Sequence, residues 1–198
     1  MPTGSALRRG PFVLVGSVVL AAVIALSTLM AGSASADGKY GGRWVFGRIE
    51  QAYLATGGPN MWGNPTNNES AAANGGRFQN FAKDTAFYWH PRVANGVAHQ
   101  VGGAIRAKWA GLNWERGPLG YPTSNEQATA NDGRMNSFQG GNVYWGPYSD
   151  AHPVWGEIYK VWQRSGGANS WYQLPTSDEY RIGTSFAQDF QGGTITWP

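Results

Sequence analysis

The sequence predicts an α+β repeat protein of three units, each made of a short helix followed by a β-hairpin. The main observation is an octet that occurs three times, as WGNPTNNE at 62–69, LGYPTSNE at 119–126 and YQLPTSDE at 172–179. Pro122 follows Pro65 by 57 positions, and Pro175 follows Pro122 by 53. Self-similarity at such a period is typical of repeat architectures. Recurrent helix and hairpin patterns on either side of the octet complete the prediction.

The octet has a structural interpretation. Proline fixes its own φ and keeps the preceding residue extended, and the Thr-Ser/Asn-Asp/Asn cluster favours a turn. A carboxylate four residues after the proline can accept backbone N–H groups of that turn. We therefore expect a structural role for Gly120 and for the recurring prolines and glutamates, which are Pro65, Pro122, Pro175, Glu69, Glu126 and Glu179.

A helix is expected before each octet. The three helices begin with Gly47-Arg48-Ile49, Gly103-Ala104-Ile105 and Gly156-Glu157-Ile158, and an aromatic residue follows each isoleucine by four positions, as Tyr53, Trp109 and Trp162. Residues at i and i+4 share one helix face. Glycines at 57–58, 111 and 166–167 supply stop signals. Helices of two to three turns are marginal alone, so the isoleucine–aromatic face must be buried.

A hairpin is expected after each octet. Gly140-Gly141 and Gly192-Gly193 separate β-forming residues, which favours a two-residue turn with positive φ at both positions. The equivalent segment of the first unit, residues 81–89, is longer by one residue and predicts a bulge or a wider loop. Alternation along Val143-Tyr144-Trp145 places Tyr144 on the face opposite to the other two.

Connectors join the units, and they carry His99 and His152 in the same position, where a packing or capping role is expected. The expected breaks lie inside these connectors, which gives a repeat domain at 44–198 with units at about 44–98, 99–151 and 152–198. A unit of one helix and one hairpin can hardly bury its own apolar face. The units must therefore stack on one another.

The first 36 residues read as a signal peptide. Arg8 and Arg9 form a positive start, residues 12–30 are mostly apolar, and Ala34-Ser35-Ala36 is a small-residue cleavage site. The apolar run is nearly long enough to cross a bilayer, so a retained anchor is the alternative. Residues 37–43 are expected to be a flexible lead-in. A secreted, cell-envelope location follows, with no membrane attachment after cleavage.

Composition limits the possible functions. The formal net charge of +3 falls to +1 when Arg8 and Arg9 are removed, so a nucleic-acid partner is not indicated. There is no cysteine, so the exported chain depends on its apolar core rather than on disulfides. All ten tryptophans follow residue 36, which makes the remaining chain tryptophan-rich.

The order of these motifs resembles the LGFP-repeat family of exported actinobacterial cell-wall proteins, over nearly all of residues 44–198. The second unit matches best, with Leu119-Gly120-Tyr121-Pro122, and the outer units depart from this tetrapeptide. The resemblance implies a pseudo-symmetric, propeller-like packing and a cell-envelope binding or anchoring module. Relatives carry such repeats beside mycoloyltransferase or amidase domains, and the ligand usually suggested is arabinogalactan.

Catalytic chemistry is not indicated. The three histidines lack metal-ligand spacing, the Gly-x-Ser-x-Gly motif is absent, and the three octet glutamates belong to different units. We therefore expect no catalytic residues, no metal and no cofactor. A glycosidase needs two carboxylates across one cleft, and a pair such as Asp132 with Glu126 keeps a wall-glycan hydrolase open as an alternative.

Binding is better supported, because carbohydrate sites combine aromatic faces with polar groups. Recurring tryptophans, Trp89, Trp145 and Trp197 among them, are expected in the core, so the ligand candidates are aromatics specific to one unit. The candidate ligand-binding residues are Trp114, Trp155, Trp171, Tyr121 and Asn64. The leading hypothesis is a non-enzymatic module that recognises wall polysaccharide of the arabinogalactan type. The alternative partner is an envelope protein, contacted through the same aromatic surface.

Overall fold

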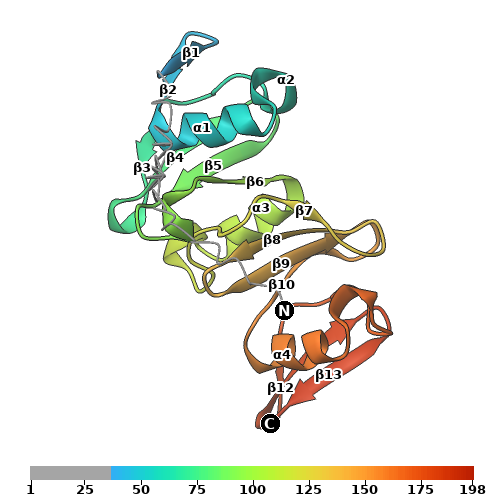
Figure 1. Ribbon diagram of the computed structural model, residues 1–198. Coiled ribbons are helices and arrows are strands. Elements are labelled where there is room, and N and C mark those ends of the chain that lie inside the picture. The colour runs from blue at the N-terminus through green and yellow to red at the C-terminus, as the bar shows by residue number, and fades with distance from the viewer. Residues whose placement is uncertain (1–36) are drawn as a thin grey trace, which may run out of the picture. The chain divides into compact units, whose positions relative to one another are not determined.

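The computed structural model describes residues 37–198, so the signal-peptide prediction for residues 1–36 lies outside the described part of the chain (Figure 1). Within that part, three similar units follow one another. Unit one (47–102) contains α1 (Gly47–Ala55), α2 (Gly58–Trp62), β3 (Ser70–Ala71), β4 (Arg77–Phe81), β5 (Thr85–Trp89) and β6 (His99–Gly102).

Unit two repeats this order without the equivalent of α2, and unit three lacks both this helix and the fourth strand. Unit two (103–155) contains α3 (Gly103–Gly111), β7 (Gln127–Ala128), β8 (Arg134–Phe138), β9 (Gly141–Gly146) and β10 (Asp150–Val154). Unit three (156–198) contains α4 (Gly156–Arg164), β11 (Tyr180–Ile182), β12 (Ser185–Phe190) and β13 (Gly193–Trp197). Short 3₁₀ turns lie at Ala73–Gly75, Ala94–Gly96, Trp114–Arg116 and Gly167–Asn169.

Each unit forms its own open antiparallel sheet. The strand orders are β3-β4-β5-β6, β7-β8-β9-β10 and β11-β12-β13. The prolines of the octets make equivalent single bridges, Pro65 to Phe81, Pro122 to Phe138 and Pro175 to Phe190. The α+β repeat architecture is confirmed. The propeller-like arrangement is not, because no sheet among residues 37–198 closes on itself.

The boundaries of the units differ from those expected. His99 begins β6 and Ala151 lies in β10, and these strands pair with β5 and β9 of the preceding unit. The connector therefore completes the sheet behind it, and the natural break falls at the glycine that begins the next helix.

Residues 37–43, expected to be a flexible lead-in, contain β1 (Gly38–Tyr40) and the start of β2 (Arg43–Val45). This strand pair has the register of the later connectors, because Tyr40 pairs with Arg43 as Tyr88 pairs with His99. The Tyr40 ring packs edge-on against Tyr53 at 5.2 Å, and its hydroxyl donates to Glu50 at 2.8 Å. The β1–β2 pair is thus a rudimentary preceding unit that covers α1.

Both faces of the central hairpin strand are covered, and this holds the units together. In β9, Val143 joins the cluster of its own helix, which includes Ile105 and Trp109. The next residue, Tyr144, points to the other face and packs edge-on against Trp162 of unit three at 4.8 Å. Tyr88 meets Trp109 in the same way at 4.6 Å. The predicted alternation and the mutual burial of units are both confirmed.

The predicted helix faces are fully buried. The isoleucine–aromatic pairs are at most 2% exposed in α1, α3 and α4 (Ile49 and Tyr53, Ile105 and Trp109, Ile158 and Trp162). Within residues 37–198, no helix is long and apolar enough to span a membrane.

A buried amide links each unit to the strand before it. The side-chain amide of Gln188 donates to Pro153 O at 2.8 Å and to Ser177 O at 2.9 Å. Asn136 bridges Gln100 O and Ser124 O, and Gln79 bridges Trp44 O and Asn67 O. These amides satisfy carbonyl groups on both sides of each junction, as buried polar groups require.

The hairpin turns differ from expectation. The turns of units two and three are Gln139-Gly140 and Gln191-Gly192, because Gly141 and Gly193 already pair in the strands. Neither turn glycine has a positive φ. A Cβ at Gly140 or Gly192 would lie 2.0 Å from a carbonyl oxygen of the preceding loop. Close approach of two backbones, rather than turn conformation, explains these glycines. The loop of unit one is longer by one residue, as predicted.

Candidate functional site

The same pocket occurs in every unit, between the start of the helix and the end of the hairpin. The first pocket is lined by Phe46, Gly47, Arg48, Ile49, Glu69, Arg77 and Trp89. The second is lined by Gly102, Gly103, Ala104, Ile105, Glu126, Arg134 and Trp145. The third is lined by Trp155, Gly156, Glu157, Ile158, Glu179, Phe186 and Trp197. Their volumes are about 300, 460 and 230 Å³.

Strand register places the tryptophan of each pocket. Trp89, Trp145 and Trp197 pair with Arg77, Arg134 and Phe186, so each pair shares one face of its hairpin. We expected these tryptophans in the core, and this holds only in part, because Trp89 and Trp145 pack against the core clusters of their units without being fully buried. Trp89 and Trp145 are half-buried and Trp197 is 37% exposed. They lie where the hairpin extends past the helix, so part of each indole lines the pocket.

The glutamates of the octets also have a different role from the one expected. No backbone N–H within residues 37–198 donates to Glu69, Glu126 or Glu179. Side chains two positions earlier cap the turn instead, and Asn67, Ser124 and Ser177 accept N–H groups from β4, β8 and β12 at 2.7 to 2.9 Å. The glutamates are thereby left to face the pockets.

Two of these carboxylates lie near a guanidinium without closing a tight ion pair. Glu69 is 3.7 Å from Arg77, and Glu126 is 3.9 Å from Arg134. Burial raises the pKa of both carboxyl groups, and the neighbouring arginine partly offsets that rise. A loose pair of this kind keeps acceptor and donor positions open to a ligand.

The helix start supplies the opposite wall. Gly47, Gly103 and Gly156 have φ of +47°, +52° and +54°, a region that favours glycine, and the space beside each is open. The N-cap residues Phe46, Gly102 and Trp155 give α1, α3 and α4 no side-chain cap, although Asp37 Oδ1 accepts the N–H of Gly47 at 3.1 Å. The N–H of Gly103 donates to Asp84 O at 3.1 Å. The other first-turn N–H groups lack helical partners, so these walls can still donate hydrogen bonds.

Three positions vary between the pockets. The residue before the helix glycine is Phe46, Gly102 or Trp155, and the residue after it is Arg48, Ala104 or Glu157. The residue paired with the tryptophan is Arg77, Arg134 or Phe186. The first pocket therefore has two guanidinium groups and one carboxylate, the second has one of each, and the third has two carboxylates.

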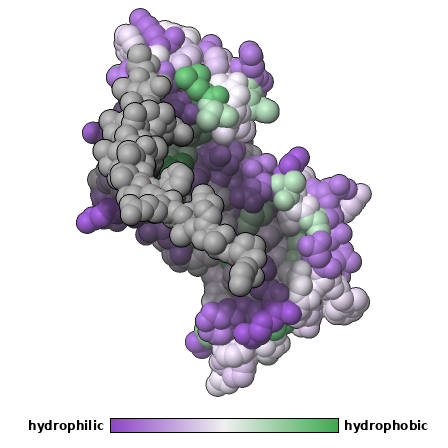
Figure 2. Space-filling model, in the orientation of Figure 1, coloured by the Kyte–Doolittle hydropathy of each residue, from purple (hydrophilic) through white to green (hydrophobic). Residues whose placement is uncertain are grey.

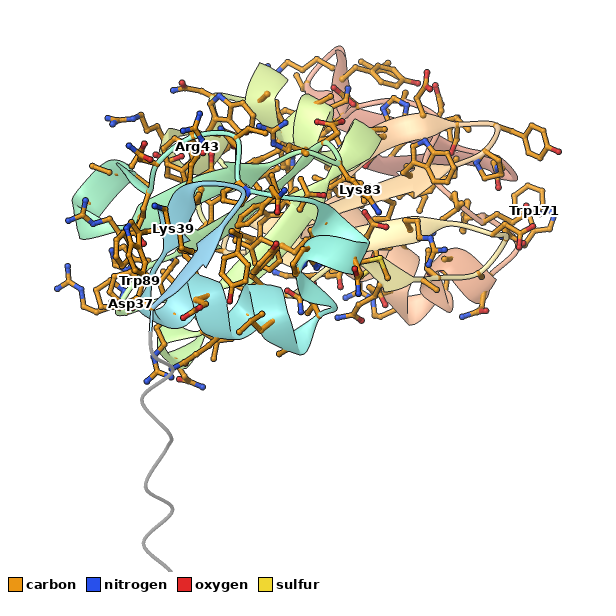
Figure 3. All side chains as sticks on the ribbon, turned by 90° about the horizontal axis from the view of Figure 1, so that it is seen from above. Asp37, Lys39, Arg43, Lys83, Trp89 and Trp171 are labelled. Carbon is orange, nitrogen blue, oxygen red and sulfur yellow. The ribbon has the colours of Figure 1, made fainter. Side chains whose placement is uncertain are left out.

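The ligand candidates proposed from sequence do not come together. Trp171 is 73% exposed and projects from the surface, far from Trp89 (Figure 3). Trp114 is half-buried, with its ring edge-on to Trp109 at 5.3 Å and the Arg106 guanidinium 5.4 Å above it. Trp155 alone of the five lines one of the repeated pockets.

Two further candidates have other positions. Tyr121 is 3% exposed, and its hydroxyl donates to the carbonyl of Ala73, so it joins units one and two rather than meeting a ligand. Asn64 is exposed, and its carbonyl accepts the N–H of Ala82 at the hairpin loop. Tyr121 is therefore corrected to a core residue.

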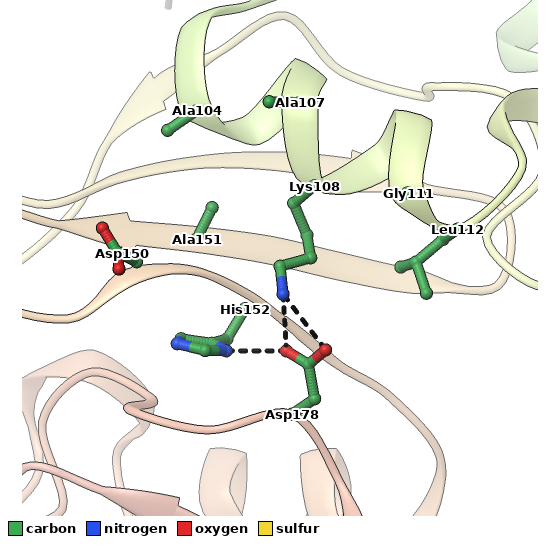
Figure 4. A pocket seen from close by; sticks show the side chains of 9 residues that line it. All are labelled: Ala104, Ala107, Lys108, Gly111, Leu112, Asp150, Ala151, His152 and Asp178. Atoms are coloured by element: carbon green, nitrogen blue, oxygen red, sulfur yellow. Dashed lines mark hydrogen bonds and ion pairs between the residues drawn. The ribbon is translucent and has the colours of Figure 1, made fainter.

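A further cavity, of about 480 Å³, lies between α3, β10 and the octet of unit three (Figure 4). There Asp178 accepts hydrogen bonds from Lys108 at 3.0 Å and contacts His152 Nδ1 at 2.6 Å. His99 meets Asn125 at 3.4 Å in the equivalent position. Both histidines thus link a connector strand to the next octet. No group of three metal-binding side chains is present within residues 37–198.

A model of the LGFP repeat matches two segments, residues 63–117 and 119–170. The chain belongs to the LGFP repeat family. No curated protein matches it. Membership indicates a repeat module of an envelope-associated protein. Each matched LGFP segment runs from one octet through its hairpin to the helix of the next unit, so the family's repeat contains a complete junction between units.

The repeated pocket is not predictable from repetition alone, because core residues recur in every unit as well. The sequence does contain an indication of the site. The glutamate, the tryptophan and the helix glycine recur in every unit, whereas the residues beside them differ in charge from unit to unit. Polar residues that vary around a constant tryptophan are more typical of a surface site than of packing.

Proposed function

We propose that this protein is a non-enzymatic, exported module that binds cell-envelope polysaccharide through its repeated pockets. The observation that carries the proposal is the recurrence of one partly exposed tryptophan, one glutamate and one helix start around a pocket in all three units. Structural packing alone requires no polar residue in an open pocket.

The chemistry of the first two pockets suits a sugar ring. An indole offers an apolar surface to the C–H face of a sugar, while a carboxylate accepts and a guanidinium donates hydrogen bonds to hydroxyl groups. Small-molecule sites commonly combine such apolar walls with a few converging polar groups. Glu69 with Arg77, and Glu126 with Arg134, supply these groups beside Trp89 and Trp145.

Repetition suits a polymer. A single sugar pocket binds weakly, but several pockets on one chain raise the effective concentration of each later contact. A wall polysaccharide of the arabinogalactan type presents the same residue many times. On the coloured part of the face shown in Figure 2, hydrophobic residues form only small groups among hydrophilic ones, which is consistent with local sugar contacts.

Retention on purified wall polysaccharide tests the proposal. Retention should be lost in a triple variant that carries Trp89→Ala, Trp145→Ala and Trp197→Ala. The control variant Trp171→Ala, at an exposed position outside the pockets, should keep at least half of the wild-type retention. Thermal unfolding checks that both variants fold. Equal retention of the triple variant and the wild type would remove the pockets from the account.

Hydrolysis of the polymer is the enzymatic alternative, and the third pocket is where it would occur. A glycosidase uses two carboxyl groups, and only this one of the three repeated pockets holds two, Glu157 and Glu179. We propose that no sugar is released. Reducing ends that appear with wild-type protein and disappear with Glu179→Gln would establish hydrolysis instead.

One observation favours a protein partner as a second function. Trp171 is 73% exposed at a loop tip, and exposed tryptophans are common at protein interfaces. Photo-crosslinking from position 171 in intact cells separates the two functions. The second function is supported if one envelope protein is crosslinked from position 171 and is not crosslinked when the probe is placed at an unrelated surface position.

A further inference from the structure

The third pocket differs from the first two in chemistry as well as in sequence. Its helix-start residue is Glu157, where the others have Arg48 and Ala104, and Phe186 replaces the arginine that faces Trp89 or Trp145. Trp155 replaces Phe46 or Gly102. The pocket therefore loses its lining cation and gains both a second carboxylate and aromatic surface.

Three aromatic side chains line this pocket from two directions. Phe186 and Trp197 are register partners on one face of β12 and β13. Trp155 approaches from the N-terminal end of α4, seated over Gly141, where an added Cβ would lie 2.9 Å from Trp155 Cβ. Phe186 and Trp155 are half-buried, and Trp197 is 37% exposed. Trp155 and Phe186 also pack against core clusters of buried residues.

The carboxylate of Glu179 is left without a cation. Glu69 and Glu126 each have an arginine within 4 Å, but the equivalent residue here is Phe186. Among residues 37–198, no ion pair or hydrogen bond to Glu179 is present. Glu157 does have a partner, because Lys160 donates to it at 2.6 Å on the exposed side of α4. Glu179 is thus the carboxylate available to a ligand.

The arginine of unit three has moved to the neighbouring strand. Arg181 lies opposite Phe186, at the position held by Ala71 and Ala128 in the other units. Its guanidinium is 4.8 Å from the centre of the Phe186 ring, and Arg181 does not line the pocket. The Phe186 ring therefore already has one cation beside it.

Aromatic rings and a carboxylate that line one pocket can together receive an organic cation. The negative face of each ring attracts a cation, and the attraction grows when the site is partly desolvated. We propose that the third pocket binds a compact organic ammonium group, with Trp155, Phe186 and Trp197 as its walls and Glu179 as its counter-ion. This inference does not depend on polysaccharide binding by the first two pockets.

Two pairs of probes test the proposal, each a cation with its neutral counterpart. Choline is compared with 3,3-dimethylbutan-1-ol, and protonated glucosamine with glucose, by calorimetric titration and by the indole N–H resonance of Trp197. We expect at least one cation to bind about tenfold more tightly than its neutral partner. Preference for choline indicates a quaternary ammonium ligand, and preference for glucosamine indicates an amino sugar.

Variants locate the site. Glu179→Gln keeps the shape and removes the charge, so it should lower the affinity for the cation about tenfold. Phe186→Arg with Arg181→Ala restores the pattern of the first two pockets and should abolish cation binding. Tyr148→Ala, at a position 91% exposed outside the pocket, is the matched control. Circular dichroism confirms folding.

Equal affinity for the charged and neutral probes overturns the proposal, as does cation binding that survives both Glu179→Gln and the double variant. Failure here leaves the polysaccharide account intact, because retention through the first two pockets does not use Glu179. Loss of polysaccharide retention with intact cation binding gives the reverse result, so the two accounts fail separately.

Discussion

Glu126 illustrates how one residue serves a pocket at a cost to stability. Burial raises the pKa of its carboxyl group, and Arg134 only partly opposes this. An acid whose pKa is raised by folding contributes stability that is complete below its unfolded-state pKa and is lost as pH rises through the folded-state pKa. The ionised form needed to accept hydrogen bonds from a sugar is therefore the less stable one.

Opposite pH trends follow for Glu126. Ligand binding by the second pocket should weaken as pH falls through the raised pKa, because the carboxylate becomes protonated. Glu126→Gln should unfold with the same free energy as the wild type in acid and a larger one at neutral pH. Urea unfolding across this range, with titration of the ligand, measures both. A wild type that gains stability over the variant as pH rises would reverse the sign we derive.

Two tryptophans of unit two should respond differently to truncation. Trp109 is fully buried against Tyr88 and Phe138, so Trp109→Ala should cost about 3–5 kcal/mol of unfolding free energy. Trp145 is half-buried at the pocket, so Trp145→Ala should cost less while it removes binding there. Chemical denaturation compares them. Equal losses of stability would place Trp145 in the core after all.

At the scale of the element, buried amides fasten each octet to the strand before it. Gln188→Leu removes the donor for Pro153 O and Ser177 O without changing the apolar volume greatly. Each buried acceptor left unpaired costs about 1–3 kcal/mol, so we expect a loss of about 2 kcal/mol or more. Gln127→Ala, on an exposed strand, is the control. The midpoints of chemical denaturation of the two variants and the wild type measure this loss. If Gln188→Leu has the same midpoint as the wild type, water replaces the amide as the hydrogen-bond donor.

The helices and hairpins were predictable from sequence because their signals are local. Glycine, the Ile–aromatic spacing and the alternation along Val143-Tyr144-Trp145 each depend on a few adjacent residues. The strand β1 was not predictable, since a three-residue strand of Gly38, Lys39 and Tyr40 has no pattern of its own. It forms because α1 must be covered as α3 and α4 are covered by the sheets before them.

The site was harder to predict for a different reason. Whether Trp145 is core or surface depends on how far the hairpin extends past the helix, which no local pattern encodes. The role of Glu126 likewise depended on Ser124 satisfying the turn in its place. Both errors came from assigning recurrent residues to packing, although a repeated site recurs as well.

For the whole molecule, the junctions repeat one contact, an aromatic of one unit set edge-on to the helix aromatic of the next. Thr196 occupies the corresponding position in the last unit and is exposed.

If several pockets bind one polymer chain together, the loss of one pocket should affect the binding of the polymer more than the binding of a monosaccharide. Removing one pocket, by Trp89→Ala, should weaken binding to wall polysaccharide about tenfold or more, because each linked contact multiplies the others. Binding of a monosaccharide by the second pocket should be unchanged. Surface plasmon resonance on immobilised polymer, beside titration with the monosaccharide, measures both. If Trp89→Ala weakens polymer binding only by the share that one of several independent pockets contributes, the pockets do not act together and the avidity account is wrong.

The claim that each unit presents a tryptophan-walled pocket is tested most directly by indole N–H resonances during titration with a wall oligosaccharide. The account predicts that Trp89 and Trp145 shift together with added ligand, while the buried Trp109 and Trp162 and the distant Trp171 stay in place. Shifts confined to Trp171 or Trp114, with Trp89 and Trp145 unmoved, would contradict it.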